Sequence, residues 1–254
     1  MNINLENENL SNMEKCAIAH LLNKQNKNIN DDLEQMWYLM DMVWDDMGLN
    51  NKKLDWQKIG EYYSHPVWIL NGLFIQNHEL SMYIRKSIAR YIESNNFKYV
   101  LDYGGGFGTL AREIAKKSKN IAIDIYEPFP SEYGKKCVKE FKNISFIDRL
   151  QSNKYDCIIS TDVLEHVDDV LITLKEMLDS LKIGGKALIG NCFYPVIKCH
   201  LPKNFHYRYS FKYIAKSMNA NYINRVSGAE YVEVYEKIDN PNITYKTKSI
   251  GGGE

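Results

Sequence analysis

The chain has 254 residues, which is long enough for one large domain or for a smaller domain with a helical appendage. Its 44% hydrophobic and 25% charged content is typical of globular proteins and excludes a wholly disordered or collagen-like chain. Thirty-two basic side chains balance thirty-two acidic ones, and no apolar run approaches the roughly 20 residues that span a bilayer. We therefore expect a folded protein that binds neither nucleic acid nor membranes.

The cysteines and the N-terminus indicate the cellular compartment of the protein. The five cysteines are odd in number and scattered, without the close pairs of zinc or thiol redox motifs. The first residues are polar and acidic, unlike a signal peptide. Both observations predict a cytoplasmic protein, and the abundance of Asn, Lys and Ile is typical of an AT-rich bacterial genome.

The N-terminal part, residues 1–96, has the periodicity of helices, and all four tryptophans fall in it. Asn30 or Asp31 is a cap candidate for one helix, and Gly48 supplies its end. We predict a helical cap over a neighbouring domain; a tryptophan-rich homodimer surface is the alternative. The apolar positions that recur every three or four residues are Leu33, Met36, Trp37, Met40, Trp44 and Met47, then Leu80, Ile84, Ile88, Tyr91 and Ile92.

Residues 97–240 alternate between short apolar runs and helical patterns. Such alternation predicts an α/β fold, a Rossmann-like doubly wound sheet that is mostly parallel, covered on both sides, and ends in an antiparallel C-terminal strand. The tail, residues 241–254, is expected to be flexible. The expected strands are 99–103, 121–126, 144–147, 155–160, 186–190, 222–226 and 231–236, and the expected helices are 110–117, 131–141, 169–181 and 211–218.

The segment after the first expected strand carries the first functional signal, because ligands of open parallel sheets bind at the carboxyl ends of strands. Gly104, Gly106 and Gly108 alternate there, and glycine lets the backbone turn sharply and approach a ligand. The carboxylate of Asp102 would repel a pyrophosphate and suits a cationic ligand. This pattern resembles motif I of the class I S-adenosylmethionine-dependent methyltransferases; an ordinary strand-to-helix turn is the alternative.

Acidic residues also follow the second and third strands. Glu127 stands at the tip of the second strand, where a carboxylate can accept hydrogen bonds from both ribose hydroxyls. Asp124, inside the same strand, is the competing candidate. After the third strand, the resemblance implies that Asp148 lies near the adenine amine and Leu150 beside the ring, unless both are solvated loop residues.

The fourth and fifth strands extend the resemblance. Residues 155–167 end in Val-Leu-Glu-His-Val, as in small-molecule methyltransferases such as the ubiquinone-biosynthesis O-methyltransferases, and residues 181–189 are similar to their Leu-Lys-Pro-Gly-Gly turn, with Ile183 for the proline. The resemblance implies S-adenosylmethionine as methyl donor and S-adenosylhomocysteine as product. It also implies cofactor contacts from Tyr103 and Thr161.

An acid and histidine group follows the fourth strand. Asp162, Glu165 and His166 form an Asp-x-x-Glu-His pattern, and some relatives with a Glu-x-x-Glu-His version hold a divalent cation. The resemblance therefore implies a magnesium or manganese site, although the first acid differs. A helix-starting turn held by local hydrogen bonds is the alternative, and His166 is also a candidate for catalysis.

Two other segments could complete the site. The connection after the fifth strand, residues 192–210, is dense in aromatic residues and carries His200, our first choice as general base or further metal ligand, and His206, the second. Surface loop positions are the alternative for both. In the N-terminal part, Tyr63 and His65 are candidates for a lid over the cofactor.

An alcohol is a poor nucleophile until it loses its proton, so a histidine base or a metal next to the cofactor indicates O-methylation. Trp and Tyr side chains stack on rings and hydrogen-bond hydroxyls, which predicts a sugar or sugar nucleotide of bacterial polysaccharide or natural-product biosynthesis as acceptor. The alternatives are an N- or C-methyltransferase, a nicotinamide-dependent oxidoreductase and a non-catalytic cofactor-binding protein. Asp102 and the absence of a G-x-G-x-x-G motif disfavour the oxidoreductase.

Overall fold

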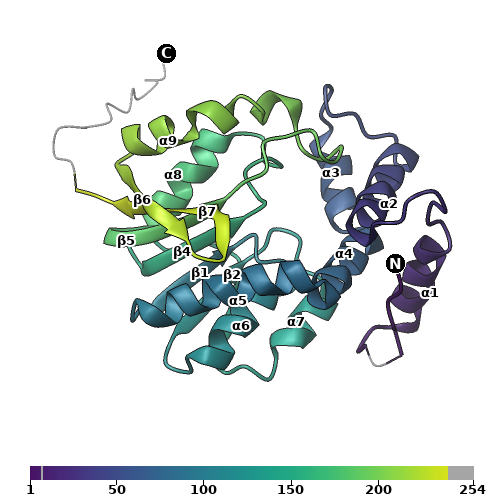
Figure 1. Ribbon diagram of the computed structural model, residues 1–254, viewed down its shortest axis with the longest axis horizontal. Helices are drawn as coiled ribbons and strands as arrows, with labels where there is room; N and C mark the ends of the chain where they lie inside the picture. Colours follow the sequence, from purple (N-terminus) through teal and green to yellow (C-terminus); the bar gives the residue numbers. More distant parts are fainter. Residues whose placement is uncertain (7, 240–254) are drawn as a thin grey trace, which may run out of the picture.

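The computed structural model describes residues 1–6 and 8–239; the expected tail lies outside the described residues. A group of helices precedes alternating strands and helices (Figure 1). The helices are α1 (Asn12–Leu22), α2 (Asp32–Asp46), α3 (Trp56–Tyr63), α4 (Pro66–Asn77), α5 (Glu79–Ser94), α6 (Thr109–Lys117), α7 (Glu132–Val138), α8 (Val170–Ser180) and α9 (Tyr207–Ser217). The strands are β1 (Tyr99–Tyr103), β2 (Ala122–Tyr126), β3 (Ile144–Ile147), β4 (Tyr155–Thr161), β5 (Leu181–Gly190), β6 (Ala220–Val226) and β7 (Ala229–Lys237).

The strands form one seven-stranded sheet in the order β3-β2-β1-β4-β5-β7-β6. Strands β1 to β5 are parallel, and β7 runs antiparallel to both β5 and β6. The predicted fold class is therefore confirmed. The strand order reverses between β1 and β4, so the expected ligand position lies at the carboxyl end of β1, where Asp102 is level with Ile125 of β2 and Ile159 of β4.

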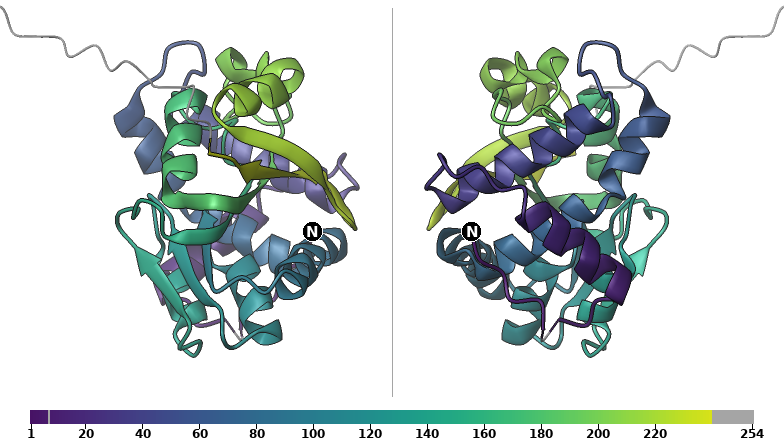
Figure 2. Two further views of the ribbon diagram at one scale, coloured as in Figure 1. Left: turned by 90° about the vertical axis from the view of Figure 1, so that its left-hand side faces the viewer. Right: turned by 90° about the vertical axis from the view of Figure 1, so that its right-hand side faces the viewer.

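Helices cover both faces of the sheet, because alternate residues of the central strands point to opposite sides. Val100 of β1 packs with α5 and α6, whereas Leu101 packs with α8 and α9 (Figures 1 and 2). Three buried residues of α5, Ile88, Ala89 and Ile92, belong to the first of these cores. The domain boundary predicted after residue 96 stays a prediction, but in packing terms α5 is part of the sheet layers.

Helices α1 to α4, which we call the cap, form a separate core at one end of the sheet (Figures 1 and 2). Trp44 and Tyr62 lie at its centre, with ring centroids 5.1 Å apart. Helices α1, α2 and α3 begin with ordinary Ser or Asp caps: the side chain of Asp31, for example, accepts hydrogen bonds from Leu33 and Glu34 at the start of α2. Among residues 1–6 and 8–239, no helix combines the length and the apolar character needed to cross a bilayer.

The cap core also includes Phe107 from the glycine-rich turn, which lies against Gly72 of α4. A Cβ atom at Gly72 would stand 2.2 Å from the Phe107 ring, so only glycine allows this contact. The cap and the turn are therefore packed together directly.

We predict that Gly72→Ala lowers the free energy of unfolding by about 1–3 kcal/mol, because the buried Phe107 ring has to move out of a packed core. Gly60→Ala in α3 is the matched control, since its Cβ would meet only Phe129, which is 40% exposed and free to shift. Urea titration of both variants measures the difference. Equal stabilities of the two variants would contradict this account of the contact.

Candidate functional site

A cavity of about 1130 Å³ lies between the cap and the carboxyl ends of β1, β2 and β4. The cap contributes mainly apolar and aromatic side chains to it, including Trp37, Met40 and Tyr63. The sheet edge contributes polar groups and the glycine-rich turn, and the connection after β5 contributes His200. The predicted cofactor turn and the predicted base thus open into one cavity.

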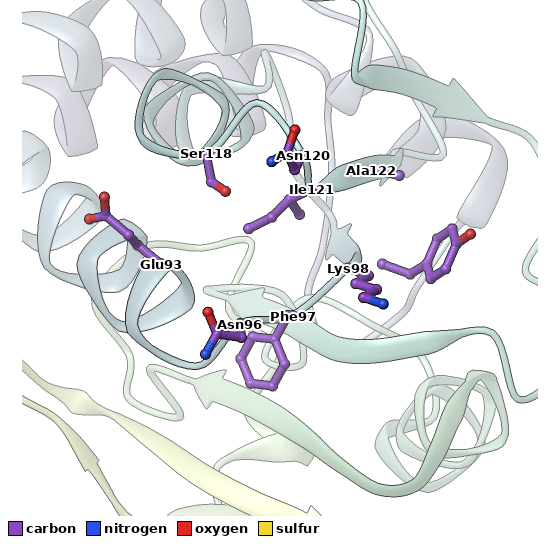
Figure 3. A pocket seen from close by; sticks show the side chains of 9 residues that line it. Glu93, Asn96, Phe97, Lys98, Ser118, Asn120, Ile121 and Ala122 are labelled. Atoms are coloured by element: carbon purple, nitrogen blue, oxygen red, sulfur yellow. The ribbon is translucent and has the colours of Figure 1, made fainter.

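A smaller hollow of about 430 Å³ lies at the opposite, amino-terminal edge of β1 and β2 (Figure 3). Its lining includes Glu93, Asn96 and Lys98. It shares no residue with the glycine-rich turn. We therefore place the functional site in the larger cavity.

The glycine-rich turn has a backbone that requires glycine. Gly104, Gly106 and Gly108 have φ angles of 72°, 53° and 67°, in the left-handed region. A Cβ atom at Gly104 would stand 2.5 Å from Val163, whereas one at Gly106 would meet nothing within 4 Å. Gly106 lines the cavity, so a ligand can approach the main chain there.

Glu127 connects the end of β2 to this turn. Its carboxylate accepts hydrogen bonds from the backbone N–H groups of Gly106, at 3.0 Å, and Phe129, at 3.1 Å. Burial raises the pKa of Glu127. Asp124, the competing candidate, is bound instead to Lys154 and Tyr155 at 2.5 and 2.8 Å and does not line the cavity.

Asp102 lines the cavity and is only 3% exposed, and its Oδ2 has no hydrogen-bond partner among the described residues. Burial raises its pKa to about 7, while the positive charge of Arg85 opposes this shift. Arg85, with Ser81 of the same helix α5, also lines the cavity. Sequence reasoning missed Arg85, because one arginine within an amphipathic helix carries no signal of its own.

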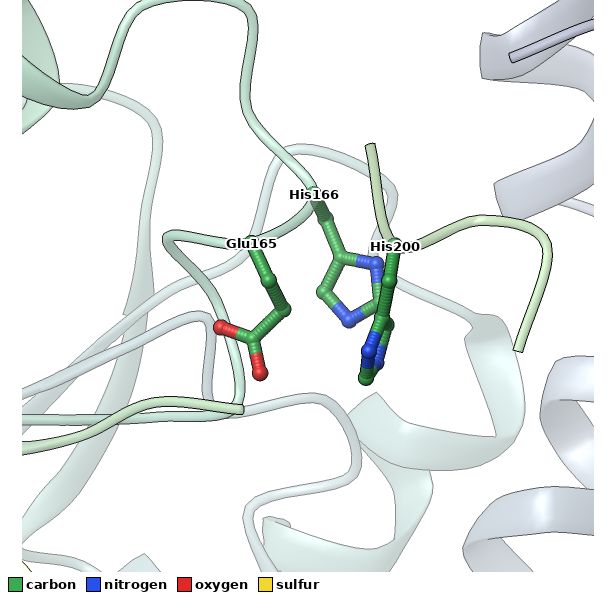
Figure 4. Close-up of side chains that lie close together, drawn as sticks. All are labelled: Glu165, His166 and His200. Carbon is green, nitrogen blue, oxygen red and sulfur yellow. The ribbon is translucent and has the colours of Figure 1, made fainter. Parts of the chain in front are cut away.

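Glu165, His166 and His200 form a cluster in which the potential ligand atoms all lie within 4.8 Å of one another (Figure 4). Each imidazole donates its Nδ1–H to a backbone carbonyl, His166 to Cys199 at 3.1 Å and His200 to Tyr194 at 2.8 Å. A carbonyl can only accept a hydrogen bond, so the proton of each neutral ring is at Nδ1 and the lone pair is at Nε2.

Burial determines the charge of this cluster. Burial and, to a smaller extent, charge repulsion from His200 lower the pKa of His166 to about 3. Burial also lowers the pKa of His200. It raises the pKa of Glu165 to about 8, with a further contribution from the charge of Asp162. Oε1 of Glu165 accepts from the Cys192 N–H at 2.7 Å, and Oε2 has no partner among the described residues. Two neutral imidazoles therefore adjoin a buried carboxyl group.

Two of the predicted catalytic or metal residues lie elsewhere. Asp162 lines the cavity but is not part of the three-residue cluster; its carboxylate faces Tyr231, whose hydroxyl is 3.4 Å away. His206 is exposed before α9, against the ring of Tyr207, and does not line the cavity. Both differences arise from tertiary placement, since each residue lies close in sequence to a cluster member.

Some of the residues predicted to contact the cofactor line the cavity, and others do not. Tyr63 and Thr161 line the cavity, and the Tyr63 ring stacks on Phe129 with centroids 5.5 Å apart. His65 also lines it, and its Nδ1 accepts from the Val67 N–H at the start of α4.

Three further residues do not line the cavity. Tyr103 is buried against Tyr126, and Leu150 is partly buried against the core that contains residues of α8 and α9. Asp148 is 86% exposed and pairs with Arg149. Asp148 and Leu150 therefore lie outside the lining of this cavity, and their expected adenine contacts stay a prediction.

Comparison with known protein families identifies the family of this chain. Residues 76–224 match the family described as a methyltransferase domain. The match spans more than half of the chain, so the protein belongs to this family, and its fold and glycine-rich turn make it a class I S-adenosylmethionine-dependent methyltransferase.

Among curated proteins, the ubiquinone biosynthesis O-methyltransferase of Rickettsia felis is 32% identical over 140 residues, which cover 51% of this chain and 57% of that protein. The protein of the same name from Rickettsia akari is 31% identical over 141 residues, covering 51% and 56%. The chain thus spans little more than half the length of the curated relatives it matches.

Solved structures show the same fold. An O-methyltransferase family protein from Burkholderia thailandensis has a TM-score of 0.59 at 12% identity, covering 82% of this chain and 73% of that one. The CurJ carbon methyltransferase has a TM-score of 0.53 at 11% identity, covering 89% and 68%. Because proteins named for oxygen and for carbon share the fold, the acceptor atom has to be argued from the side chains of the site.

We predict that Asp102 binds the ammonium group of S-adenosylhomocysteine in its ionised form. Because the pKa of Asp102 is about 7 in the free protein, the ligand should bind about tenfold more tightly at pH 8 than at pH 6. Below that pKa, binding has to release a proton first. Calorimetric titration across this range measures the effect. Asp102→Asn is the control and should bind weakly at both pH values; an unchanged pH dependence in this variant would exclude Asp102 as its source.

Proposed function

We propose that the protein transfers the methyl group of S-adenosylmethionine to a hydroxyl group of a small ring compound, with His200 as general base. One observation carries the proposal: the glycine-rich turn and two neutral imidazoles open into the same cavity. The family supplies the methyl donor, and the imidazoles supply the base that a hydroxyl acceptor needs and that a free amine, with its own lone pair, needs less. The curated relatives named as O-methyltransferases support the same reaction type.

The residues of the turn fit the cofactor. Asp102 offers an unpartnered, buried carboxylate oxygen to the ammonium group, and Glu127 offers its remaining lone pairs to the ribose hydroxyls. Arg85 lines the same cavity, and its positive charge acts on Asp102, whose pKa it lowers. This guanidinium group suits the carboxylate of the methionine part of the cofactor. The open side of Gly106 leaves room for the cofactor to approach.

The chemical step is a displacement in which the acceptor oxygen forms a bond to the methyl carbon as the carbon–sulfur bond breaks. The electron pair of that bond stays on sulfur, so the sulfonium becomes the neutral thioether S-adenosylhomocysteine. The hydroxyl proton passes to Nε2 of His200, which burial keeps unprotonated. The aromatic walls of the cap exclude water and hold the acceptor in line with the methyl group.

The cluster also fits a divalent cation. Glu165 offers an oxygen that has no hydrogen-bond partner among residues 1–6 and 8–239. His166 and His200 offer Nε2 lone pairs, and backbone carbonyls orient their rings, as is usual for histidine ligands. Two imidazoles favour manganese or zinc over magnesium. A cation held there would occupy the Nε2 lone pair of His200, so the two roles of this residue are alternatives; the cation would itself lower the pKa of the acceptor hydroxyl.

The lining of the cavity on the side of the cap bears on the substrate class. Trp37, Met40 and Ile59 of the cap and Ile197 after β5 belong to this lining, and these side chains cannot hydrogen-bond several hydroxyls at once, apart from one indole N–H. The sugar predicted from the sequence stays a proposal. The apolar lining favours a second acceptor class, an aromatic ring that carries one or two hydroxyl groups. Competition between a catechol and a sugar nucleotide in one methyl-transfer assay distinguishes the two.

We expect S-adenosylhomocysteine to bind in the micromolar range and Glu127→Gln to weaken binding by about tenfold, since the amide replaces one acceptor with a donor. Calorimetry on both proteins, with Asp148→Asn as matched control, measures this. The control should bind like the wild type, because Asp148 is exposed outside the cavity. Absence of binding to the wild type would overturn the proposed function.

We expect His200→Asn to lower kcat by about 10²–10⁴-fold while the affinity for S-adenosylhomocysteine changes less than about twofold. His206→Asn is the matched control and should keep full activity, because its ring lies outside the cavity. Single-turnover methyl transfer, with and without added manganese, provides the rates. Full activity of His200→Asn in both conditions would indicate an acceptor that needs neither a base nor a metal there.

A further inference from the structure

The connection between β5 and α9, residues 191–206, which we call the strap, is attached to the cap. The backbone N–H of Lys198 donates to Oδ1 of Asp41 on α2, at 2.7 Å. The backbone carbonyl of Lys198 accepts from the side-chain amide of Asn51, at 3.2 Å, and the Lys198 ammonium group pairs with Asp45. Three residues of the N-terminal part therefore contact one residue of the strap, although about 150 residues separate them in the sequence.

The same stretch of the strap is attached to the turn after β4. The carbonyl of Cys199 accepts from Nδ1 of His166, and the N–H of Leu201 donates to the carbonyl of Glu165 at 2.9 Å. His200 lies between these two contacts, two residues after Lys198. Its position against Glu165 and His166 thus depends on a strap that is fixed on one side by the cap and on the other by the β4 turn.

The three attachments of Lys198 differ in strength. The ammonium group and Asp45 are 42% and 57% exposed, and such surface pairs contribute little. The Asp41 carboxylate is partly buried, and a charged acceptor on a backbone donor makes one of the stronger hydrogen bonds. Removing it would leave a backbone donor unpaired beside the cap core, which contains the neighbouring Ile197 and Cys199.

We propose that Asp41 of the cap is a positioning residue for His200, so that the cap and the catalytic cluster form and separate together. This inference rests on the proposed function only for the role of His200; the attachment itself is independent of it. The cap forms one wall of the cavity, and the Asp41 contact links the strap to that wall, so that His200 reaches its place in the cluster when the cap is packed on the sheet.

The test uses four variants of the full chain. Asp41→Ala removes the acceptor, and Asp41→Asn retains an amide oxygen for the Lys198 N–H. Asp46→Ala, on the same helix, loses only an exposed pair with Lys24 at 3.7 Å. Lys198→Ala keeps the backbone donor and loses the ammonium group.

We expect Asp41→Ala to lower kcat by about 10- to 100-fold, while KM for S-adenosylmethionine and the affinity for S-adenosylhomocysteine stay within about twofold. Asp41→Asn, Asp46→Ala and Lys198→Ala should stay within about threefold of the wild-type kcat. Hydrogen exchange of residues 192–206 should accelerate in Asp41→Ala and in none of the other three.

Several results would overturn the inference: a wild-type kcat and wild-type strap exchange in Asp41→Ala, an equal loss in Asp41→Asn, or a joint loss of kcat and cofactor affinity. If Asp41→Ala does not fold, Asn51→Ala should show a smaller change of kcat and exchange in the same direction, and no change there would contradict the proposal. A wild-type protein that fails to methylate any acceptor overturns the proposed function, while the exchange data still decide whether Asp41 holds the strap.

Discussion

Burial of ionisable side chains at the carboxyl edge of the sheet is the constraint on which the rest of the site depends. The cap packs on this edge through Phe107 and the strap, and the buried ionisable groups there change their proton affinities accordingly. Desolvation is the largest cause of the raised pKa of Asp102 and Glu165 and of the lowered pKa of His166. A carboxyl group at Asp102 that ionises less readily than usual and imidazoles that stay neutral are both consequences of this one packing arrangement.

Hydrogen bonds to backbone groups orient the side chains of the site. The carbonyls of Cys199 and Tyr194 hold the protons of both rings at Nδ1, which leaves Nε2 as the basic atom in each. The N–H groups of Gly106 and Phe129 hold the carboxylate of Glu127 at the tip of β2. The side chains are therefore oriented before any ligand binds, and a preoriented site loses less conformational entropy on binding.

The functional signals that were predicted from the sequence are local ones. The buried strands appear as apolar runs, the glycine-rich turn follows β1 within five residues, and the acid of β2 lies directly after its strand. Such features depend on backbone conformation and on strand direction, both of which are encoded within short segments. For this reason Asp102, Gly106 and Glu127 could be assigned to the cofactor turn from the sequence, and the structure brings all three to one cavity.

The sequence by itself thus determined the order of strands and helices from residue 97 onward, the family resemblance and the position of the glycine-rich turn. Only the tertiary structure decided that His200 and not Asp162 completes the cluster with Glu165 and His166, that His206 faces solvent, and that Asp148 lies outside the cavity. It also revealed Arg85 and the contact of Asp41 with the strap. The physical reason is that these contacts join segments far apart in the chain, and their geometry depends on how the cap packs on the sheet.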